Sequence, residues 1–407
     1  MSKAFARGAC PGLSAPMSTG DGLLARLVAA GPIPLDAFIG LCDSAGVHGN
    51  GIMEISARGS IQIRGLSSIS APLFAAAVEA LGIDLCESVP VLSDPLPDDP
   101  TALIDSQAIA AALRQAIAHA ALALAPKVSL VIDGGGRIGL DTLPADIRLQ
   151  AAETSEGPRF HVTLAGDAST ATEVGVITPQ DAVDAVLALL STIAATGLEA
   201  RGADLLPPRG AASLPATLQP RAEAIGLHPL KAGECALGVG LAFGHAEAGA
   251  LKALAEVALA QGARWGRPAP DRCLLLGPLG ETNAIATVRE AHRLGFVTDV
   301  TDPRRRIVAC AGAPACGSGL IAARSLAAEI AREVSLPGEG LAVHVSGCAK
   351  GCAHPAPAPL TMVGTEQGCG IVANDTACAT PSSYLDPNEL VAALGGSGRK
   401  MREAVNA

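Results

Sequence analysis

Hydrophobic and polar positions follow the same order in two parts of the chain. Residues 20–66 and 233–279 each contain an alternating apolar run, a turn, an amphipathic helical stretch and an alternating strand that ends near Gly-Leu or Pro-Leu. Alternation with a period of two indicates a half-buried strand, and a period near 3.6 indicates a helix. The two parts match weakly in identity and well in pattern, so we predict that the chain is an internal duplication.

Each half continues with a second group of strands and helices. The pattern in the first half predicts a Pro- and Asp-rich connector at 88–100, a helix at 101–125, strands at 127–133 and 158–165, and a helix at 179–197. Asp105 or Ser106 suits the start of the first of these helices, and Thr178 suits the N-cap of the second. The second half carries a group of cysteines and a last helix near 387–395. This irregular mixture of strands and helices indicates the α+β class rather than a regular parallel α/β sheet.

The composition narrows the range of partners. The chain has 407 residues, enough for two to four domains. Hydrophobic residues make up 49% of it but aromatic residues only 2%, so stacking on nucleic-acid bases is not expected. The net charge is −10 and there is no basic stripe, which argues against a nucleic-acid partner. The negative net charge is still compatible with an anionic small molecule as the ligand, because a pocket can be basic inside an acidic protein.

The hydropathy pattern also bears on location. The longest apolar stretch, residues 235–260, is interrupted by charged residues, so no segment offers the roughly 20 apolar residues of a membrane span. The first residues contain no apolar core of the kind found in secretory signals. We therefore expect a cytoplasmic protein that does not enter the membrane.

Four of the eleven cysteines form a pattern of their own. Cys310 and Cys316 are separated by five residues, Cys348 and Cys352 by three, and 31 residues lie between the pairs. Four thiolates from two loops are the ligands of a four-iron–four-sulfur cluster. The remaining cysteines are interpreted as buried small hydrophobic residues or as cysteines without a short-range partner: Cys10, Cys42, Cys86, Cys235, Cys273, Cys369 and Cys378.

The residues around the pairs support the cluster interpretation. Residues 311–315 are small or rigid and let the backbone approach a cluster. We expect Cys316 to lie just before a helix over 320–334, where the helix dipole favours a thiolate. A strand at 343–346 should lead into the second pair. Zinc is the main alternative, but structural zinc prefers pairs spaced two to four residues apart, and four unrelated buried thiols are a further one.

This cysteine spacing, within a duplicated α+β chain, resembles the sulfite/nitrite reductase superfamily. The phrase ISARGSIQIRGL (55–66) is similar to the substrate-side strand of that superfamily. The opening phrase GACPGLSAPMSTGDGLLARL (8–27) resembles more specifically the precorrin-3B synthase family of aerobic cobalamin biosynthesis. The resemblance covers about residues 7–395. It implies two ferredoxin-like half-domains, at 7–87 and 220–300, and two α+β domains, at 88–205 and 301–395, of which the last carries the cluster.

The resemblance also implies an activity. In the synthase family, precorrin-3A is hydroxylated at carbon 20 with molecular oxygen, and a lactone forms with the acetate of ring A. Such an enzyme is an oxidoreductase of the monooxygenase type. The family implies an iron–sulfur cluster, allows a mononuclear non-haem iron, and takes electrons from reduced nicotinamide through a reductase partner.

Departures from the superfamily pattern separate synthase from reductase. The reductases hold a small anion with two Arg and two Lys, of which Arg58 and Lys127 have counterparts here. The second Arg is missing from residues 86–96, and Ser129 stands at the second Lys position. With two positive groups absent, attraction to a sulfite dianion is weaker. This weaker attraction disfavours a sirohaem-dependent sulfite or nitrite reductase. The third alternative is a non-enzymatic iron–sulfur electron carrier or tetrapyrrole scaffold, and the large duplicated fold exceeds what such a protein needs.

Basic side chains near the start are the candidate substrate contacts. Arg58, Gln62 and Arg64 are spaced to share one face of a strand, where an Arg fork suits a substrate carboxylate. With Lys127 they form the predicted catalytic set, and ordinary surface ion pairs are the alternative. Further candidates are weaker: Lys350 as a cluster or substrate contact; His354, Asp21 and Asp43 as iron ligands; His245; and Arg304, Arg305 and Arg306 as a docking or substrate site.

Overall fold

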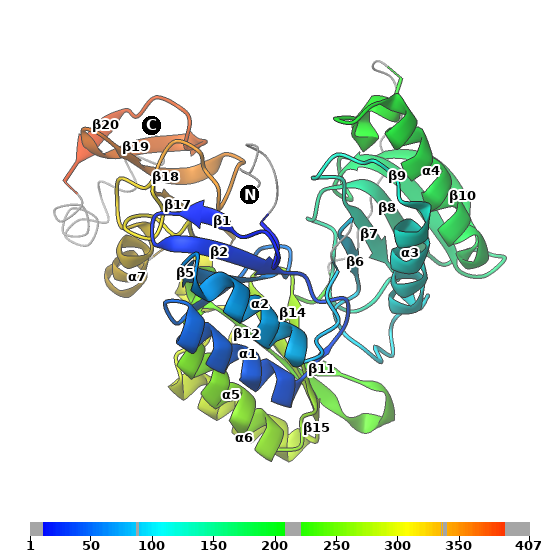
Figure 1. Cartoon of the computed structure of the whole chain (residues 1–407), viewed down its shortest axis with the longest axis horizontal. Helices are drawn as coiled ribbons and strands as arrows, with labels where there is room; N and C mark the ends of the chain where they lie inside the picture. The colour runs from blue at the N-terminus through cyan, green and yellow to red at the C-terminus, as the bar shows by residue number, and fades with distance from the viewer. Residues whose placement is uncertain (1–10, 87–88, 208–220, 335, 337–339, 387–407) are drawn as a thin grey trace.

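The computed structural model describes residues 11–86, 89–207, 221–334, 336 and 340–386. Cys10 and the helix predicted near 387–395 lie outside the described residues. Within them the chain forms four five-stranded sheets with helices packed on them, which confirms the predicted α+β class (Figure 1). No helix in this part of the chain is long and apolar enough to cross a membrane.

The first two sheets are antiparallel and have the same topology. The first has the order β1 (Met17–Thr19), β2 (Gly22–Leu27), β5 (Ile61–Leu66), β4 (Ile52–Ile55) and β13 (His245–Glu247). The second has the order β11 (Gly226–Pro229), β12 (Cys235–Gly240), β15 (Cys273–Leu279), β14 (Trp265–Ala269) and β3 (Ile33–Pro34). Each sheet therefore ends in a strand from the other half of the chain: β13 pairs with β4, and β3 pairs with β14.

Four helices cover one face of these two sheets and lie together at the bottom of Figure 1. They are α1 (Leu35–His48), α2 (Ser70–Ala80), α5 (Ala248–Ala260) and α6 (Glu281–Arg293). The alternation along β5 shows why the sheet faces them: Ile61 and Ile63 are buried in the core, and Gln62 and Arg64 point to the opposite face. Side chains from both halves fill this core, so the exchanged strands join the halves into one unit.

The other two sheets also repeat one pattern. The third contains β6 (Val91–Ser93), β7 (Leu130–Asp133), β8 (Ala145–Ala152), β9 (Arg159–Gly166) and β10 (Thr172–Ile177). The fourth contains β16 (Ile307–Ala309), β17 (Val343–Ser346), β18 (Ala358–Thr365), β19 (Gly368–Asp375) and β20 (Ser383–Leu385). In each, the first three strands are parallel and the last two run antiparallel to their neighbours. The repeated topology confirms the predicted duplication.

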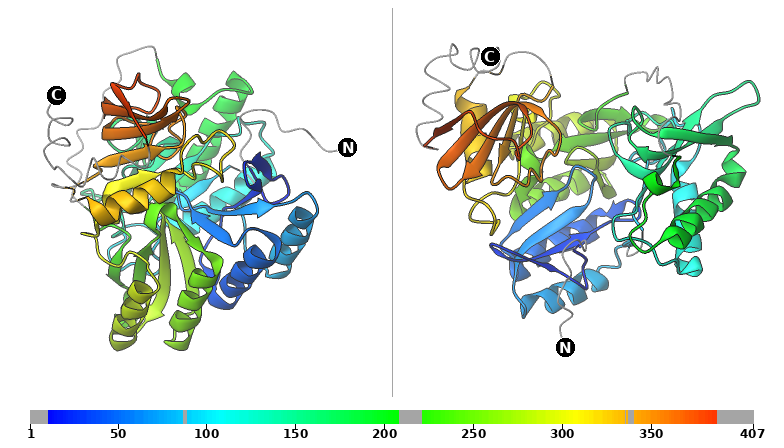
Figure 2. Two further views of the ribbon diagram at one scale, coloured as in Figure 1. Left: turned by 90° about the vertical axis from the view of Figure 1, so that its left-hand side faces the viewer. Right: turned by 90° about the horizontal axis from the view of Figure 1, so that it is seen from above.

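Helices α3 (Ser106–Ala120) and α4 (Ala182–Thr196) pack on the third sheet, and α7 (Ala323–Glu333) packs on the fourth (Figure 2). As predicted, Asp105 caps α3, and its carboxylate accepts from the N–H groups of Gln107 and Ala108. Thr178 caps a short 3-10 turn that runs into α4. The 3-10 turns are Pro179–Asp181, Gly202–Leu205, Lys231–Gly233, Ala242–Gly244 and Pro303–Arg306.

Candidate functional site

The two cysteine pairs lie on loops that leave adjacent parallel strands. Cys310 follows β16 directly, and Cys348 comes two residues after β17. The N–H of Gly347 donates to the sulfur of Cys310 at 3.0 Å, which joins the loops. Burial raises the pKa of the Cys352 thiol, and the nearby thiols of Cys310, Cys348 and Cys316 raise it further. The fold therefore brings all four predicted cysteines together.

Small residues let these loops approach closely. A Cβ atom on Gly347 would lie 2.9 Å from Gly312 Cα and 3.4 Å from Cys310 Sγ, so a side chain would force the loops apart. The N–H of Leu320 donates to Gly347 O at 2.7 Å, and the ammonium of Lys350 donates to Ser318 at 2.9 Å. Lys350 thus bridges the two cysteine loops on their exposed side.

One expectation about Cys316 is wrong. It does not lie at a helix N-terminus, because α7 begins only at Ala323. The chain first folds back on itself: the N–H of Ala313 donates to Ile321 O at 2.8 Å, and the N–H of Cys316 donates to Gly312 O at 2.7 Å. These contacts close the loop before the helix can start.

Four thiols are the type of donor set that iron–sulfur clusters use, and the backbone N–H on Cys310 Sγ suits a thiolate ligand. Within the described residues, however, no three His, Cys, Asp or Glu side chains already stand in a geometry that could hold a metal ion. The candidates for a separate iron are also apart and occupied. Asp21 is bonded to Arg64, Asp43 pairs with Lys252 at 2.7 Å, and His354 contacts Pro357 O at 3.3 Å. Among the described residues, these three candidates thus do not form a ligand set for a mononuclear iron.

Arg58 and Arg64 do not share a strand face, which corrects the prediction. Arg58 lies in the turn between β4 and β5, because β5 begins only at Ile61. Its guanidinium donates to Pro144 O at 2.5 Å, and its second terminal nitrogen, Nη2, is buried with no hydrogen-bond partner among the described residues. Arg64 makes two 3.0 Å hydrogen bonds to Asp21, so its guanidinium is occupied within the protein.

Arg58 lies in a strongly basic environment. Burial lowers its pKa to about 10, and the charges of Arg26 and Arg148 act in the same direction. Arg148 is fully buried on β8; it donates to Leu140 O at 3.1 Å, while its Nε and Nη1 have no partner in the part of the chain that the structure describes. The sequence analysis missed Arg26 and Arg148, although an Arg inside the apolar run ADIRLQAA is a detectable signal.

The other predicted contacts lie around this basic region. Gln62 is half-buried on β5, opposite Arg26 and Glu54 in the sheet register. Lys127 is exposed two residues before Ser129, whose N–H donates to Asp146 at 2.9 Å. Asp146 is also among the charges that act on Arg58, so Lys127 lies near the same end of the third sheet.

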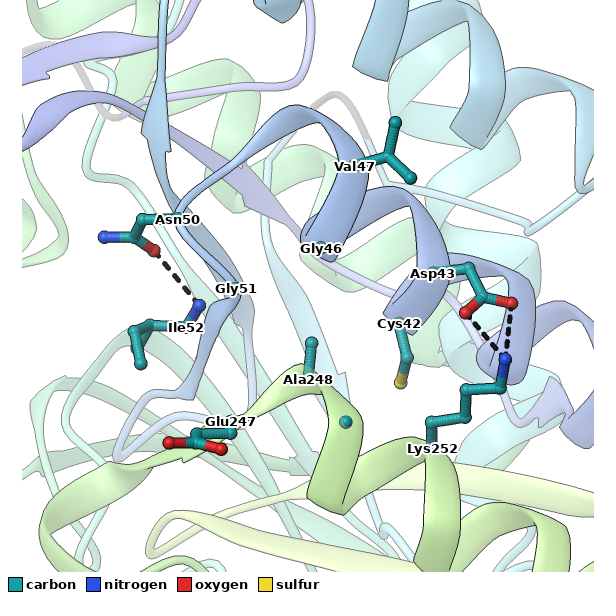
Figure 3. Close-up of a pocket in the computed structure, with 11 residues that line it drawn as sticks. Cys42, Asp43, Gly46, Val47, Asn50, Gly51, Ile52, Glu247, Ala248 and Lys252 are labelled. Atoms are coloured by element: carbon teal, nitrogen blue, oxygen red, sulfur yellow. Dashed lines mark hydrogen bonds and ion pairs between the residues drawn. The ribbon is translucent and has the colours of Figure 1, made fainter.

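The remaining candidates have mostly structural contacts. Arg304 pairs with Asp302 at 2.6 Å, Arg305 with Glu223, and Arg306 donates to the carbonyl oxygens of Leu336 and Gly340. Burial lowers the pKa of His245 to about 4. A cavity of about 470 Å³ lies between α1 and the start of α5, beside the Asp43–Lys252 pair (Figure 3). None of the four cluster cysteines or the predicted substrate residues lines it.

Comparisons with known proteins identify relatives of the chain and of its fold. A protein from Sinorhizobium sp named precorrin-3B synthase is 40% identical over 410 residues, which cover 98% of this chain and 89% of that protein. The solved structure of the Mycobacterium tuberculosis NirA protein matches with a TM-score of 0.69 at 17% identity, covering 95% of this chain and 84% of that one. No protein-family model matches. The structural match confirms the predicted sulfite/nitrite reductase-like fold.

Proposed function

Because the chain belongs to the precorrin-3B synthase family, we propose that it hydroxylates precorrin-3A at carbon 20 with molecular oxygen and forms the lactone with the ring A acetate. In such a monooxygenase reaction one oxygen atom enters the substrate, and the other is reduced to water with two electrons and two protons. The electrons would come from reduced nicotinamide through a reductase partner, in the cytoplasm.

The observation that supports this proposal is the half-buried guanidinium of Arg58, whose Nη2 has no hydrogen-bond partner among the described residues. A desolvated N–H of a guanidinium that lacks a partner is unfavourable, and an anionic ligand that accepts a hydrogen bond from it relieves this cost. Precorrins carry several carboxylates, and a carboxylate is the natural partner of an Arg fork. We propose that Arg58 binds one substrate carboxylate, with Lys127 and Gln62 as further contacts. Arg64 is not included, since Asp21 already occupies its guanidinium.

The second part of the proposal concerns the four cysteines. Cys310, Cys316, Cys348 and Cys352 would hold a four-iron–four-sulfur cluster, which supplies single electrons when bound. The N–H of Gly347 would stabilise the Cys310 thiolate, since it already donates to that sulfur at 3.0 Å. Lys350 would place a positive charge beside the cluster from its bridge to Ser318.

A sulfite or nitrite reductase is the alternative within the same fold. Against it stands Ser129, which occupies the position of the second Lys and is nearly buried; its N–H bonds to Asp146. Asp146 is in turn paired with Arg201 at 2.8 Å. The position of the second Lys therefore carries a hydroxyl instead of a positive charge that could bind a small dianion.

The test is a product analysis under labelled oxygen. Purified, cluster-loaded protein with a chemical reductant and precorrin-3A should give a product that contains one oxygen atom from the gas. A parallel reaction without oxygen should leave the substrate unchanged, and sulfite should not be reduced. A product without the label, or turnover of sulfite, would refute the proposed hydroxylation.

A further inference from the structure

The turn between β1 and β2 lies directly on the first cysteine loop. A Cβ atom on Gly20 would lie 2.5 Å from Gly317 N, 2.7 Å from the carbonyl carbon of Cys316 and 2.7 Å from Pro314 O. All three neighbours are backbone atoms, which cannot move aside without moving the loop. Only glycine fits this contact, so the opening segment of the chain rests against residues more than 290 positions away.

Asp21 and Arg64 extend the same contact. The Arg64 guanidinium is buried, binds Asp21 through two 3.0 Å hydrogen bonds and donates to Ala315 O inside the cysteine loop. Asp21 is held in turn by Thr19 at 2.8 Å and Asn50 at 3.0 Å. Although burial works against its ionisation, hydrogen bonds from Arg64 and Thr19 lower the pKa of Asp21, so the pair is ionic.

A second ion pair fixes the far side of this loop. Glu54, on β4, lies 2.8 Å from a guanidinium nitrogen of Arg324 at the start of α7, and 3.5 Å from Arg64. The first sheet therefore contacts the cysteine loop near Ala315 and also contacts the helix that follows it. An open cavity of about 190 Å³ beside the loop is lined in part by these groups.

We propose that Gly20, Asp21 and Arg64, here termed the loop clamp, are positioning residues that hold the Cys310–Cys316 loop in its ligand-bearing conformation. The clamp does not contact substrate. It rests on the proposed cluster, and it gives the segment STGDG (18–22) of the opening phrase a physical role. It also links the Arg58 turn to the cysteine loop, because β5 (Ile61–Leu66) begins three residues after Arg58 and carries Arg64.

The test compares Gly20→Ala with Gly31→Ala, a matched control in the same half whose added Cβ would meet no atom within 4 Å. In cluster-loaded protein, Gly20→Ala should release iron to a chelator about 10–100-fold faster than wild type, the range for lost outer-shell support. Gly31→Ala should match wild type. Equal release rates for Gly20→Ala and wild type would overturn the clamp.

Two substitutions of Arg64 distinguish the effect of its charge from that of its hydrogen-bond geometry. Arg64→Lys keeps the charge and one hydrogen bond to Asp21, whereas Arg64→Gln loses the charge. The clamp predicts release rates in the order wild type, Arg64→Lys, Arg64→Gln, together with a changed electron paramagnetic resonance spectrum of the reduced cluster. Arg64→Gln with the wild-type rate and spectrum would refute the clamp.

A measurement on the metal-free protein distinguishes the loop clamp from the proposed iron–sulfur cluster. In the apo-protein, well below its melting temperature, Gly20→Ala should raise the alkylation rate of Cys310 and Cys316 roughly tenfold over that of Gly31→Ala, because overpacking opens the loop. Unchanged alkylation refutes the clamp whether or not metal binds. If alkylation rises but reconstituted wild type binds no iron or sulfide, the cluster proposal fails and the clamp stands as a contact that positions the loop.

Discussion

The two copies of the parallel sheet place different chemistry on the same backbone contact. In the third sheet, the N–H of Gly134 donates to the carboxylate of Asp94 at 2.7 Å. In the fourth, the N–H of Gly347 donates to the sulfur of Cys310 at 3.0 Å. Asp94 and Cys310 each directly follow the first strand of their sheet, and each glycine follows the second. The fold supplies an N–H that favours an anion, and the residue type decides which anion.

The surroundings then separate the two copies. Asp94 also accepts a 2.5 Å hydrogen bond from Ser106, and the adjacent Asp133 is paired with Arg221. The first copy is thus closed by its own polar contacts. The second copy surrounds Cys310 with small residues and three further thiols. The two copies thus differ in chemistry: polar contacts close the first, and the second carries the four cysteines of the proposed cluster.

The hairpin turns of the two antiparallel sheets differ in the same way, since each carries an arginine that contacts a different copy of the parallel sheet. The β4–β5 turn carries Arg58, which donates to Pro144 O in the third sheet's loop. The β14–β15 turn carries Arg272, which donates to Ala353 O at 3.1 Å, next to Cys352. One arginine therefore faces the proposed substrate site, and the other supports a proposed cluster loop.

The largest effect should come from the second copy. We expect Cys348→Ser to abolish the visible absorbance, iron and sulfide of the reconstituted protein, because a cubane lacks one of its four thiolates. Metal analysis and absorbance spectroscopy measure this directly. Cys378→Ser, an exposed cysteine in the same part of the chain, is the control and should keep its cluster. A cluster that persists unchanged in Cys348→Ser would remove that residue as a ligand.

The hairpin arginines should separate substrate binding from cluster support. Arg58→Ala should cost about 2–5 kcal/mol of substrate and transition-state binding, or roughly 30-fold to several thousand-fold in kcat/KM, since the bound carboxylate loses its buried partner. Its iron content should stay normal. Arg272→Ala should instead speed cluster loss. Steady-state kinetics and iron analysis of both variants test the division, and iron loss from Arg58→Ala as fast as that from Arg272→Ala would break it.

The smallest effect should come from the first copy. Burial, with the nearby charge of Asp133, raises the pKa of Asp94 from its ordinary 3.8 to about 7. Between these values the unfolded chain has released a proton that the folded protein retains, so rising pH favours unfolding. Asp94→Asn lacks this linkage. Its stability relative to wild type should therefore increase from pH 4 to pH 7 in denaturant titrations, and parallel pH profiles of the two proteins would contradict the shift.

Local patterns in the sequence were sufficient for part of the site. The cysteine spacings predicted four thiols on two loops, and the structure brings them together. The alternation around Ile61 and Ile63 predicted a strand with Gln62 and Arg64 on its polar face. The same reasoning failed for Arg58, because a strand pattern was extended across a turn. It also placed a helix start too near Cys316, because the fold-back of the loop depends on hydrogen bonds that periodicity does not reveal.

Residue patterns alone were enough to predict the duplication, the α+β class, the ligand-type cysteines and the family resemblance, since each depends on residue types and their order along the chain. Tertiary structure alone decided the exchange of β3 and β13, the basic environment that Arg26 and Arg148 create around Arg58, and the contact of Gly20 with the cysteine loop. These contacts join residues far apart in the chain. Their energies depend on burial and on backbone proximity, which exist only after the halves have packed together.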